Sequence, residues 1–232
     1  MHQIVDHDEW LAARKELLAK EKAFTRQRDE LSRQRRELPW ERVEKQYSFD
    51  GPNGHSTLAE LFDGRSQLVV YHFMFDPSWD EGCKSCSFWA DNFDPNVIHL
   101  KARDVTLVAI SRAPYAKLAA YKQRMGWSFD WFSSGETDFN FDFGVSFAPE
   151  DQEKEGAYNY GSLVPHNADR EGMSVFFKAA DGDVFHTYSA YARGIDLLNT
   201  AYNYLDLVPK GRDEERPHTQ SWVRRHDEYV HH

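Results

Sequence analysis

The feature that most constrains the fold of this chain is a long apolar run followed closely by its only two cysteines. Residues 68–75 are almost continuously apolar, which predicts a central strand covered on both faces of a sheet. Cys83 and Cys86 follow it as Cys-Lys-Ser-Cys, where the next helix is expected to begin. Unpaired N–H groups and the helix dipole favour a thiolate at such a helix start. A redox dithiol is therefore the leading hypothesis.

The elements predicted around this strand alternate between strands and helices. Before it we expect a short strand over 47–49 and a helix over 56–62. After it we expect a helix over 83–102, a strand over 105–110, a helix over 114–125 and a strand over 129–132. A hairpin of 173–178 with 184–188 around Asp-Gly and a helix over 194–205 follow. Parallel strands need crossover helices, whereas hairpins need only a turn. The order predicts a thioredoxin-like α/β fold, a mixed sheet flanked by helices.

A long N-terminal helix is predicted over residues 8–38, because charged residues of both signs alternate there and Pro39 follows. Its apolar residues recur at a strict seven-residue step: Trp10, Leu17, Phe24, Leu31 and Leu38. Such a stripe must pack either on the body of its own chain or on a second subunit, as in a homodimer. Its interleaved charges favour a solvated face over nucleic-acid binding.

The domain organisation expected from these patterns has three parts. Residues 1–38 form a helical extension, residues 39–208 the thioredoxin-like domain, and residues 209–232 a tail packed on the body through Trp222 and Tyr229. The stretch 133–170 is too long for a simple connection, and insertions of this kind often form lids or interfaces.

Composition limits the possible partners and location. The net charge of −10 opposes general affinity for nucleic acid or anionic membranes. The sequence has no apolar run of membrane-spanning length and no evident secretory signal, so a cytoplasmic protein is expected. In a reducing cytosol a static disulfide would be unusual, which favours reversible thiol chemistry.

Three separated segments carry a resemblance to a known family. They are Gly-Cys-Lys-Ser-Cys-Ser-Phe-Trp-Ala-Asp at 82–91, Asp-Phe-Asn-Phe-Asp-Phe-Gly at 138–144, and Trp-Val-Arg-Arg-His-Asp-Glu-Tyr at 222–229. Over nearly its full length the chain resembles the bacterial family called domain of unknown function 899, described as predicted dithiol-disulfide oxidoreductases. The resemblance implies a thioredoxin-like fold and a redox-active cysteine pair.

The likeness to thioredoxin itself is looser. Thioredoxins carry Trp just before the first cysteine and Gly-Pro between the two, whereas here those positions are Gly82 and Lys84-Ser85. They also place a cis proline immediately before the strand that faces the dithiol. Here Glu171, Gly172 and Met173 precede that strand. The usual backbone route for docking a substrate is therefore not expected.

The dithiol hypothesis assigns different roles to the two cysteines. Cys83 is the nucleophile, which attacks a disulfide as a thiolate, and Cys86 is the resolving thiol. Lys84 would stabilise the thiolate, and the carboxylate of Asp80 would oppose it. Ser85, Trp89 and Met173 are the other expected neighbours of the site. The expected partner is a protein or small-molecule disulfide or thiol, and no cofactor is expected.

Three other functions remain open. A thiol peroxidase normally has Thr or Ser three residues before its reactive cysteine, but here that residue is Asp80. A zinc finger fails because no histidine follows His99 at the required spacing, although two cysteine pairs could hold zinc or an iron–sulfur cluster across a dimer. The third is a non-catalytic dimeric binding module.

Two further patterns are assigned to structure. The spacing of Asp138, Asn140 and Asp142 is similar to a calcium loop, but the intervening phenylalanines favour a strand with one aromatic face. His72, inside the apolar run, is expected to be a hydrogen-bonded core histidine rather than a ligand.

Overall fold

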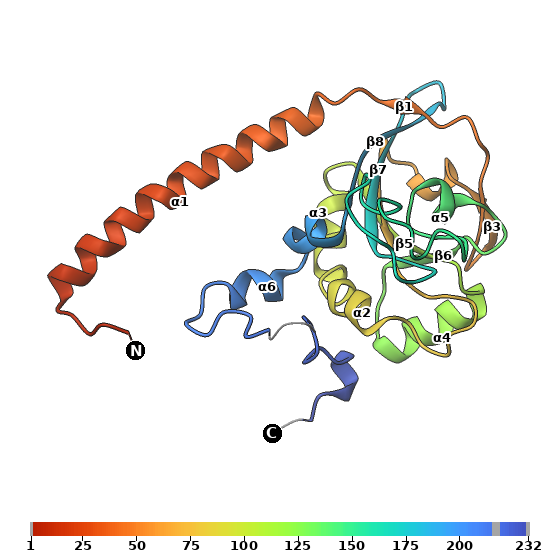
Figure 1. Ribbon diagram of the computed structural model, residues 1–232. Coiled ribbons are helices and arrows are strands. Elements are labelled where there is room, and N and C mark those ends of the chain that lie inside the picture. Colours follow the sequence, from red (N-terminus) through yellow and green to blue (C-terminus); the bar gives the residue numbers. More distant parts are fainter. Residues whose placement is uncertain (1, 215–218, 231–232) are drawn as a thin grey trace. The chain divides into compact units, whose positions relative to one another are not determined.

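The computed structural model describes residues 2–214 and 219–230 (Figure 1). The chain forms two compact units, residues Met1–Pro39 and Trp40–His232. No helix in the described part of the chain is long and apolar enough to cross a membrane.

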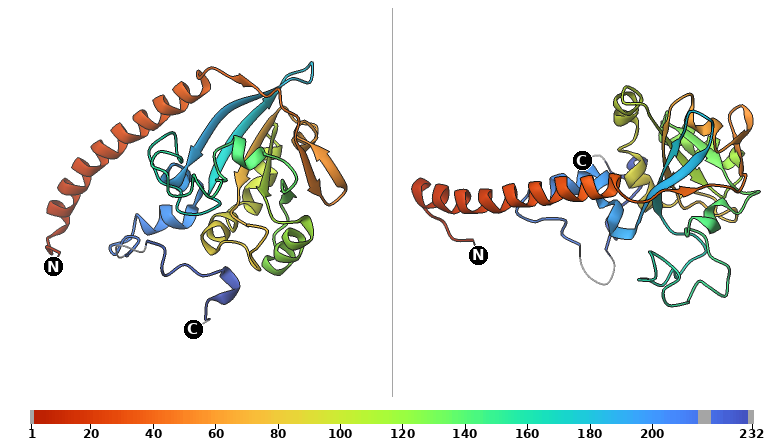
Figure 2. Two further views of the ribbon diagram at one scale, coloured as in Figure 1. Left: turned by 45° about the vertical axis from the view of Figure 1, so that its right-hand side comes forward. Right: turned by 90° about the horizontal axis from the view of Figure 1, so that it is seen from above.

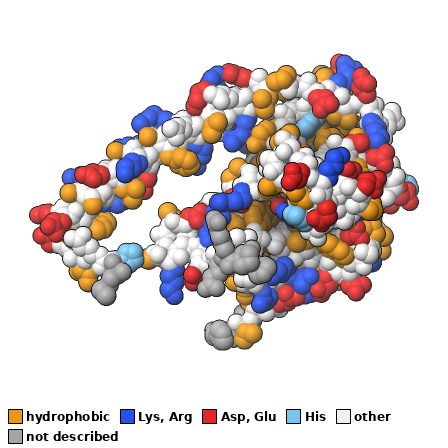
Figure 3. Space-filling model, in the orientation of Figure 1, with side chains coloured by type: hydrophobic (Ala, Val, Ile, Leu, Met, Phe, Trp, Pro, Cys, Tyr) orange, Lys and Arg blue, Asp and Glu red, His pale blue; other side chains and the backbone are white. Residues whose placement is uncertain are grey.

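The first unit is built around one helix, α1 (His7–Arg36), which begins where the Asp6 carboxylate accepts a hydrogen bond from the Glu9 amide at 2.9 Å. None of the residues of α1 is buried. The side chains of its seven-residue stripe are exposed, from 44% at Leu38 to 66% at Phe24. Charged and apolar side chains alternate along its surface in Figure 3. Packing of the stripe on the body of the chain or on a second subunit stays a prediction.

The second unit contains one eight-stranded sheet. Its strands are β1 (Glu41–Arg42), β2 (Ser48–Gly51), β3 (Gly54–Thr57), β4 (Gln67–His72), β5 (Val105–Ser111), β6 (Asp130–Ser133), β7 (Gly172–Lys178) and β8 (Val184–Tyr191). The strands lie side by side in the order β1-β8-β7-β4-β5-β6-β2-β3. Figure 2 shows the ribbon from two further directions. β4 pairs with β5 in parallel and with β7 in antiparallel orientation, and β7 and β8 form the predicted hairpin.

The helical elements follow the strands in the predicted alternation. They are α2 (Lys84–Ala90), α3 (Asp94–Lys101), α4 (Tyr115–Met125), α5 (Phe139–Asp142) and α6 (Thr200–Leu205), with three short 3-10 helices, η1 (Glu60–Phe62), η2 (Ala192–Leu198) and η3 (His226–Glu228). The order β5-β4-β7-β8, with α2 after β4 and α4 after β5, is the thioredoxin-like arrangement. The predicted fold class is confirmed.

The two faces of β4 define two hydrophobic cores, as the alternation of strand side chains requires. Tyr71 and the following Phe73 pack with residues of α2 and α4. Leu68 and Val70 pack on the other face, with residues of η1 and with Phe139 of α5. β4 is therefore covered on both sides, which explains its continuous apolar sequence.

The helix predicted over 83–102 is instead two helices, α2 and α3, separated at residues 91–93. Pro95 lies in the first turn of α3, where its missing N–H costs nothing, and it could not have continued α2. The Asn92 amide group fixes the break, because it donates to the carbonyls of Phe88 and Trp89 at 2.9 and 3.2 Å.

The helix predicted over 194–205 is also divided, into η2 and α6. Asn199 separates them because its side-chain oxygen caps α6, accepting from the amides of Ala201 and Tyr202 at 3.1 and 3.3 Å. The helix predicted over 56–62 is replaced by the end of β3 and by η1, where the Glu60 carboxylate accepts from the Thr57 amide.

The aromatic strand predicted around residues 138–143 is wrong, because this segment forms the short helix α5. Phe139 and Phe143 are four residues apart, so the helix brings their rings to one side, with centroids 4.7 Å apart. Phe139 is fully buried against Tyr47 and Phe49. Burial of these rings overrides the two-residue alternation of the sequence.

Candidate functional site

The two cysteines are fixed by the backbone of Met74, two residues after the end of β4. The Cys83 amide donates to the Met74 carbonyl at 3.1 Å, and the Met74 amide donates to the Cys86 sulfur at 3.4 Å. The central strand of the sheet thus positions both thiols. Both cysteines are free, with Cys83 partly exposed and Cys86 buried.

Cys83 is the N-cap residue of α2 and adopts an extended conformation there, with φ −54° and ψ 128°. Its carbonyl accepts hydrogen bonds from both the amide and the hydroxyl of Ser87, at 3.0 and 2.9 Å. This places the Cys83 side chain at the helix start, as predicted from the sequence.

The two thiols differ strongly in acidity. Hydrogen bonds from the Cys86 thiol and from the amides of Cys86 and Ser85 lower the pKa of Cys83 to about 7. Burial raises the pKa of Cys86 well above its ordinary value, and the neighbouring Cys83 raises it further. The partly exposed sulfur is therefore the one that carries the charge near neutral pH.

Two other titratable groups act on this pair. Glu171, just before β7, raises the pKa of both Cys83 and Cys86 through its negative charge. Tyr71 of β4 is buried and hydrogen-bonds the Cys86 side chain, and burial keeps its own pKa well above its ordinary value. Neither Glu171 nor Tyr71 lies in a recognisable sequence motif, so neither was predicted as a site residue. The one signal was that Glu171 adjoins the Gly172-Met173 pair discussed above.

A pocket of about 370 Å³ opens next to the dithiol. It is lined by both cysteines, by Ser85 and Trp89 of α2, by Tyr71 and Met74, by Arg170 and Glu171, by four residues of η2 and by Thr219 and Gln220. The pocket lining thus includes two guanidinium groups and two carboxylates, those of Arg170, Glu171, Arg193 and Asp196.

The predicted site neighbours divide between this pocket and its surroundings. Ser85 and Trp89 line it, and the Trp89 indole donates to the Ile195 carbonyl at 2.9 Å. Met173 is buried opposite Tyr71 in the sheet and belongs to the core that contains Cys86. Lys84 extends toward the Gln220 carbonyl, 3.5 Å away, and Asp80 is exposed outside the residues that line the pocket.

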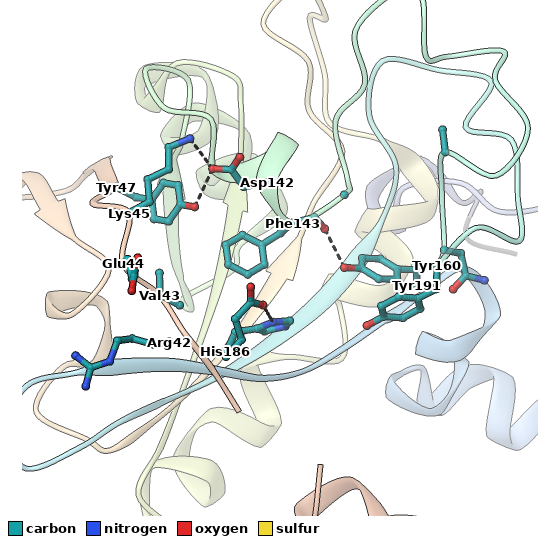
Figure 4. Close-up of a pocket in the computed structure, with 14 residues that line it drawn as sticks. Arg42, Val43, Glu44, Lys45, Tyr47, Asp142, Phe143, Tyr160, His186 and Tyr191 are labelled. Atoms are coloured by element: carbon teal, nitrogen blue, oxygen red, sulfur yellow. Dashed lines mark hydrogen bonds and ion pairs between the residues drawn. The ribbon is translucent and has the colours of Figure 1, made fainter. Parts of the chain in front are cut away.

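A second pocket, of about 400 Å³, lies against the opposite face of the sheet (Figure 4). Its polar groups pair mainly with one another. The Asp142 carboxylate accepts from Lys45 at 2.7 Å and from the Tyr47 hydroxyl at 2.8 Å. The Tyr191 hydroxyl donates to the Phe143 carbonyl at 2.9 Å. The residues that line it include no thiol, so it is a weaker candidate for redox chemistry.

A buried hydrogen-bond chain runs inward from this second pocket. His186 contacts the Ser189 hydroxyl at 2.7 Å, Ser189 contacts Ser174 at 2.8 Å, and Ser174 contacts His72 at 2.8 Å. A β-bulge at Thr187 brings His186 and Ser189 to the same face of β8. Burial lowers the pKa of His72 to about 3, so this histidine is the neutral core residue expected from the sequence.

Within residues 2–214 and 219–230, no group of three or more His, Cys, Asp or Glu side chains is placed to hold a metal ion.

Comparison with known proteins gives a family match and a set of distant structural similarities. The model of the family described as "Bacterial protein of unknown function (DUF899)" matches residues 1–229. No curated protein matches the chain significantly.

Solved structures similar to this chain include several peroxiredoxins. Peroxidoxin BcpB from Mycobacterium tuberculosis is 15% identical, with 70% of this chain and 94% of that chain covered and a TM-score of 0.46. Peroxiredoxin Q from Xanthomonas campestris is 12% identical, with coverages of 67% and 86% and a TM-score of 0.46. The mitochondrial 2-Cys peroxiredoxin from Plasmodium falciparum is 12% identical, with coverages of 76% and 96% and a TM-score of 0.41.

Proposed function

The chain belongs to the DUF899 family, and we propose that within this family it acts as a thiol-disulfide oxidoreductase through Cys83 and Cys86. One observation carries the proposal. A partly exposed thiol with a lowered pKa lies at a helix start beside a pocket, one turn before a buried thiol with a raised pKa. This asymmetry is what a two-step exchange between a nucleophile and a resolving thiol requires.

In the first step the Cys83 thiolate attacks one sulfur of a substrate disulfide. A bond forms between Cys83 and that sulfur, the substrate S–S bond breaks, and the other sulfur leaves as a thiolate that takes up a proton. Cys86 then loses its proton and attacks the Cys83 sulfur, which forms the Cys83–Cys86 disulfide and releases the second substrate thiol. The protein loses two electrons and the substrate disulfide gains them; the reverse sequence oxidises a substrate dithiol.

The proposed partner is a disulfide or thiol, on a small molecule or on a protein segment that enters the pocket beside Cys83. The pocket volume of about 370 Å³ lies within the range of sites for small molecules.

Trapping of the mixed disulfide tests the proposal. Cys86→Ser should accumulate a covalent adduct with a thiol or disulfide probe, because the first attack proceeds and the second cannot. Cys83→Ser should form no adduct under the same conditions. Intact-mass spectrometry reports the adduct, and thermal unfolding of both variants shows that each is folded. Equal adduct formation by the two variants would refute the assigned roles.

The same proteins distinguish the alternatives. If hydrogen peroxide oxidises Cys83 much faster than disulfides do, the activity is that of a thiol peroxidase. If the purified protein carries stoichiometric zinc or iron, and both substitutions release the metal and lower the melting temperature, the pair is a ligand set. A protein that forms no reversible Cys83–Cys86 disulfide in glutathione buffers would be a binding module.

A further inference from the structure

The segment of residues 219–229, which contains the third family-like sequence, packs against α2, which carries the dithiol, and against α4. The ring of Trp222 lies 5.4 Å from that of Phe88 in α2, in an edge-to-face arrangement. Val223 is fully buried. The His226 ring contacts the Asp91 carboxylate at 2.6 Å, and Arg124 of α4 pairs with Asp227 at 2.7 Å. Apolar and polar contacts along the segment thus hold it in place.

Arg225 is the residue of this segment that reaches the backbone of the dithiol loop. One terminal nitrogen of its guanidinium group donates to the Gly82 carbonyl at 3.0 Å, and Nε donates to the Tyr121 hydroxyl at 2.8 Å. The carboxylates of Glu81 and Glu228, each 2.9 Å away, orient the same group. Only 16% of the Arg225 side chain is exposed. The planar group therefore makes a set of contacts that lysine could not reproduce.

The contact with Tyr121 continues to the other side of Cys83. The Tyr121 hydroxyl lies 2.9 Å from the Ser87 hydroxyl, and Ser87 donates to the Cys83 carbonyl at 2.9 Å. Since the Ser87 proton is directed to Cys83, Tyr121 donates to Ser87 and accepts from Arg225. The two peptide groups that flank the α-carbon of Cys83 are thus both linked to one guanidinium group.

We propose that Arg225 is a positioning residue for Cys83, which holds the peptide groups on both sides of this cysteine so that its sulfur faces the amides at the start of α2. The proposal rests on Cys83 being the reactive thiol of the proposed function. It also assigns a role to a segment that lies more than 130 residues after the cysteines in the sequence.

The test is the pH dependence of iodoacetamide labelling at Cys83, measured by mass spectrometry in the full chain. Arg225→Gln should move the midpoint to higher pH and slow labelling at pH 7. A complete return to an ordinary cysteine pKa of about 8.5 would reduce the thiolate fraction at pH 7 from about one half to about 3%, so the rate should fall by up to about 15-fold. Arg225→Lys should recover only part of this loss.

Two further variants separate positioning from stability. Tyr121→Phe keeps the ring but removes the hydroxyl, so it should shift the midpoint in the same direction by a smaller amount. Arg224→Gln is the matched control, because the Arg224 guanidinium donates to the carbonyls of Ser221 and Val223 in its own segment. It should leave the midpoint unchanged.

A midpoint in Arg225→Gln equal to that in Arg224→Gln, with a lower melting temperature, would overturn the proposal and leave Arg225 a purely stabilising residue. If Arg225→Gln does not fold, a labelling midpoint of Cys83 that is unchanged in a folded Tyr121→Phe would likewise overturn the proposal. The result is independent of turnover, because labelling needs no substrate disulfide. A shifted midpoint in a protein that never forms a mixed disulfide would retain the positioning role and refute the proposed function alone.

Discussion

The Met74 amide donates to the Cys86 sulfur at 3.4 Å, and this contact ties the buried thiol to the end of the central strand. The hydrogen bond favours the thiolate of Cys86 and opposes the much larger effect of burial on its pKa. The site thus keeps Cys86 protonated in the resting dithiol while providing a donor for the charge that forms when it attacks. The carboxylate of Glu171 acts on both thiols as well, since its negative charge raises the pKa of each.

Glu171→Gln should therefore make both thiols more acidic. The negative charge of Glu171 raises the pKa of Cys83, so its removal should move the labelling midpoint of Cys83 to a pH below about 7. Labelling at pH 6 should become faster. The measurement is the iodoacetamide rate at Cys83 as a function of pH.

Asp80→Asn is the control for net charge, because it removes one carboxylate from an exposed residue outside the pocket lining. It should shift the midpoint less than Glu171→Gln does. Equal shifts in the two variants would show that the effect is a general one of net charge.

Gly82→Ala should destabilise the fold and disturb the dithiol. A β-carbon at this position would lie 2.8 Å from Phe73 and 3.0 Å from Tyr121, two rings of the core beside α2. Overpacking of this kind typically costs about 1–3 kcal/mol. Urea unfolding measures the loss. Gly194→Ala, whose β-carbon would meet Ala190 at 3.4 Å, should lose less stability.

His72 should make the protein less stable in mild acid. Its pKa is about 3 in the folded state, against an ordinary value of 6.5, so between these pH values the unfolded chain binds a proton that the folded chain does not. The free energy of unfolding therefore falls as pH decreases from 6.5 toward 3, by up to about 1.4 kcal/mol per pH unit.

Urea unfolding at pH 5, 6 and 7 measures this slope. His72→Gln cannot titrate in this range and should have a shallower slope, even if it is less stable at pH 7 through loss of the contact with Ser174. His99→Gln, at an exposed site, should keep the original slope. A slope unchanged by His72→Gln would contradict the assignment.

The seven-residue spacing of the stripe, typical of helices that pair in a coiled coil, leads us to propose a homodimer held by α1. Deletion of residues 1–38 should leave a folded chain with an unchanged Cys83 labelling rate, because the remaining residues form a compact unit. Its mass by light scattering should be that of one chain, whereas the full chain should have twice that mass.

Point variants avoid the truncation. Phe24→Glu, in the stripe, should dissociate the dimer, and Lys22→Glu, on the opposite side of the helix, should not. A full-length protein that is monomeric at all accessible concentrations would exclude the dimer.

The central strand and the position of the dithiol could be predicted because both depend on local sequence. An apolar run indicates a strand buried on two faces, and Cys83 precedes the next helix directly. Two helix breaks were missed, although Asn92 and Asn199 are residues that fix turns through their side chains. α5 could not be identified from alternation, because burial of Phe139 decides its conformation.

The environment of the thiols was less predictable than their position. Glu171 and Tyr121 act on Cys83 through tertiary contacts that no local pattern encodes. Arg225 lies in a family-like motif, but the motif does not show what its side chain contacts. Such contacts depend on packing between segments distant in the chain, which local patterns in a single sequence do not reveal.

The separation between Arg225 and Gly82 also has a consequence for synthesis. The two residues that form this hydrogen bond are 143 positions apart in the chain. At translation rates of about 5–20 residues per second, Gly82 precedes Arg225 out of the ribosome by roughly 7–30 s. During that interval Cys83 and Cys86 are present without the guanidinium group that links the peptides around Cys83. The nascent chain therefore carries its cysteine pair in an incomplete setting until residues 219–229 have been made.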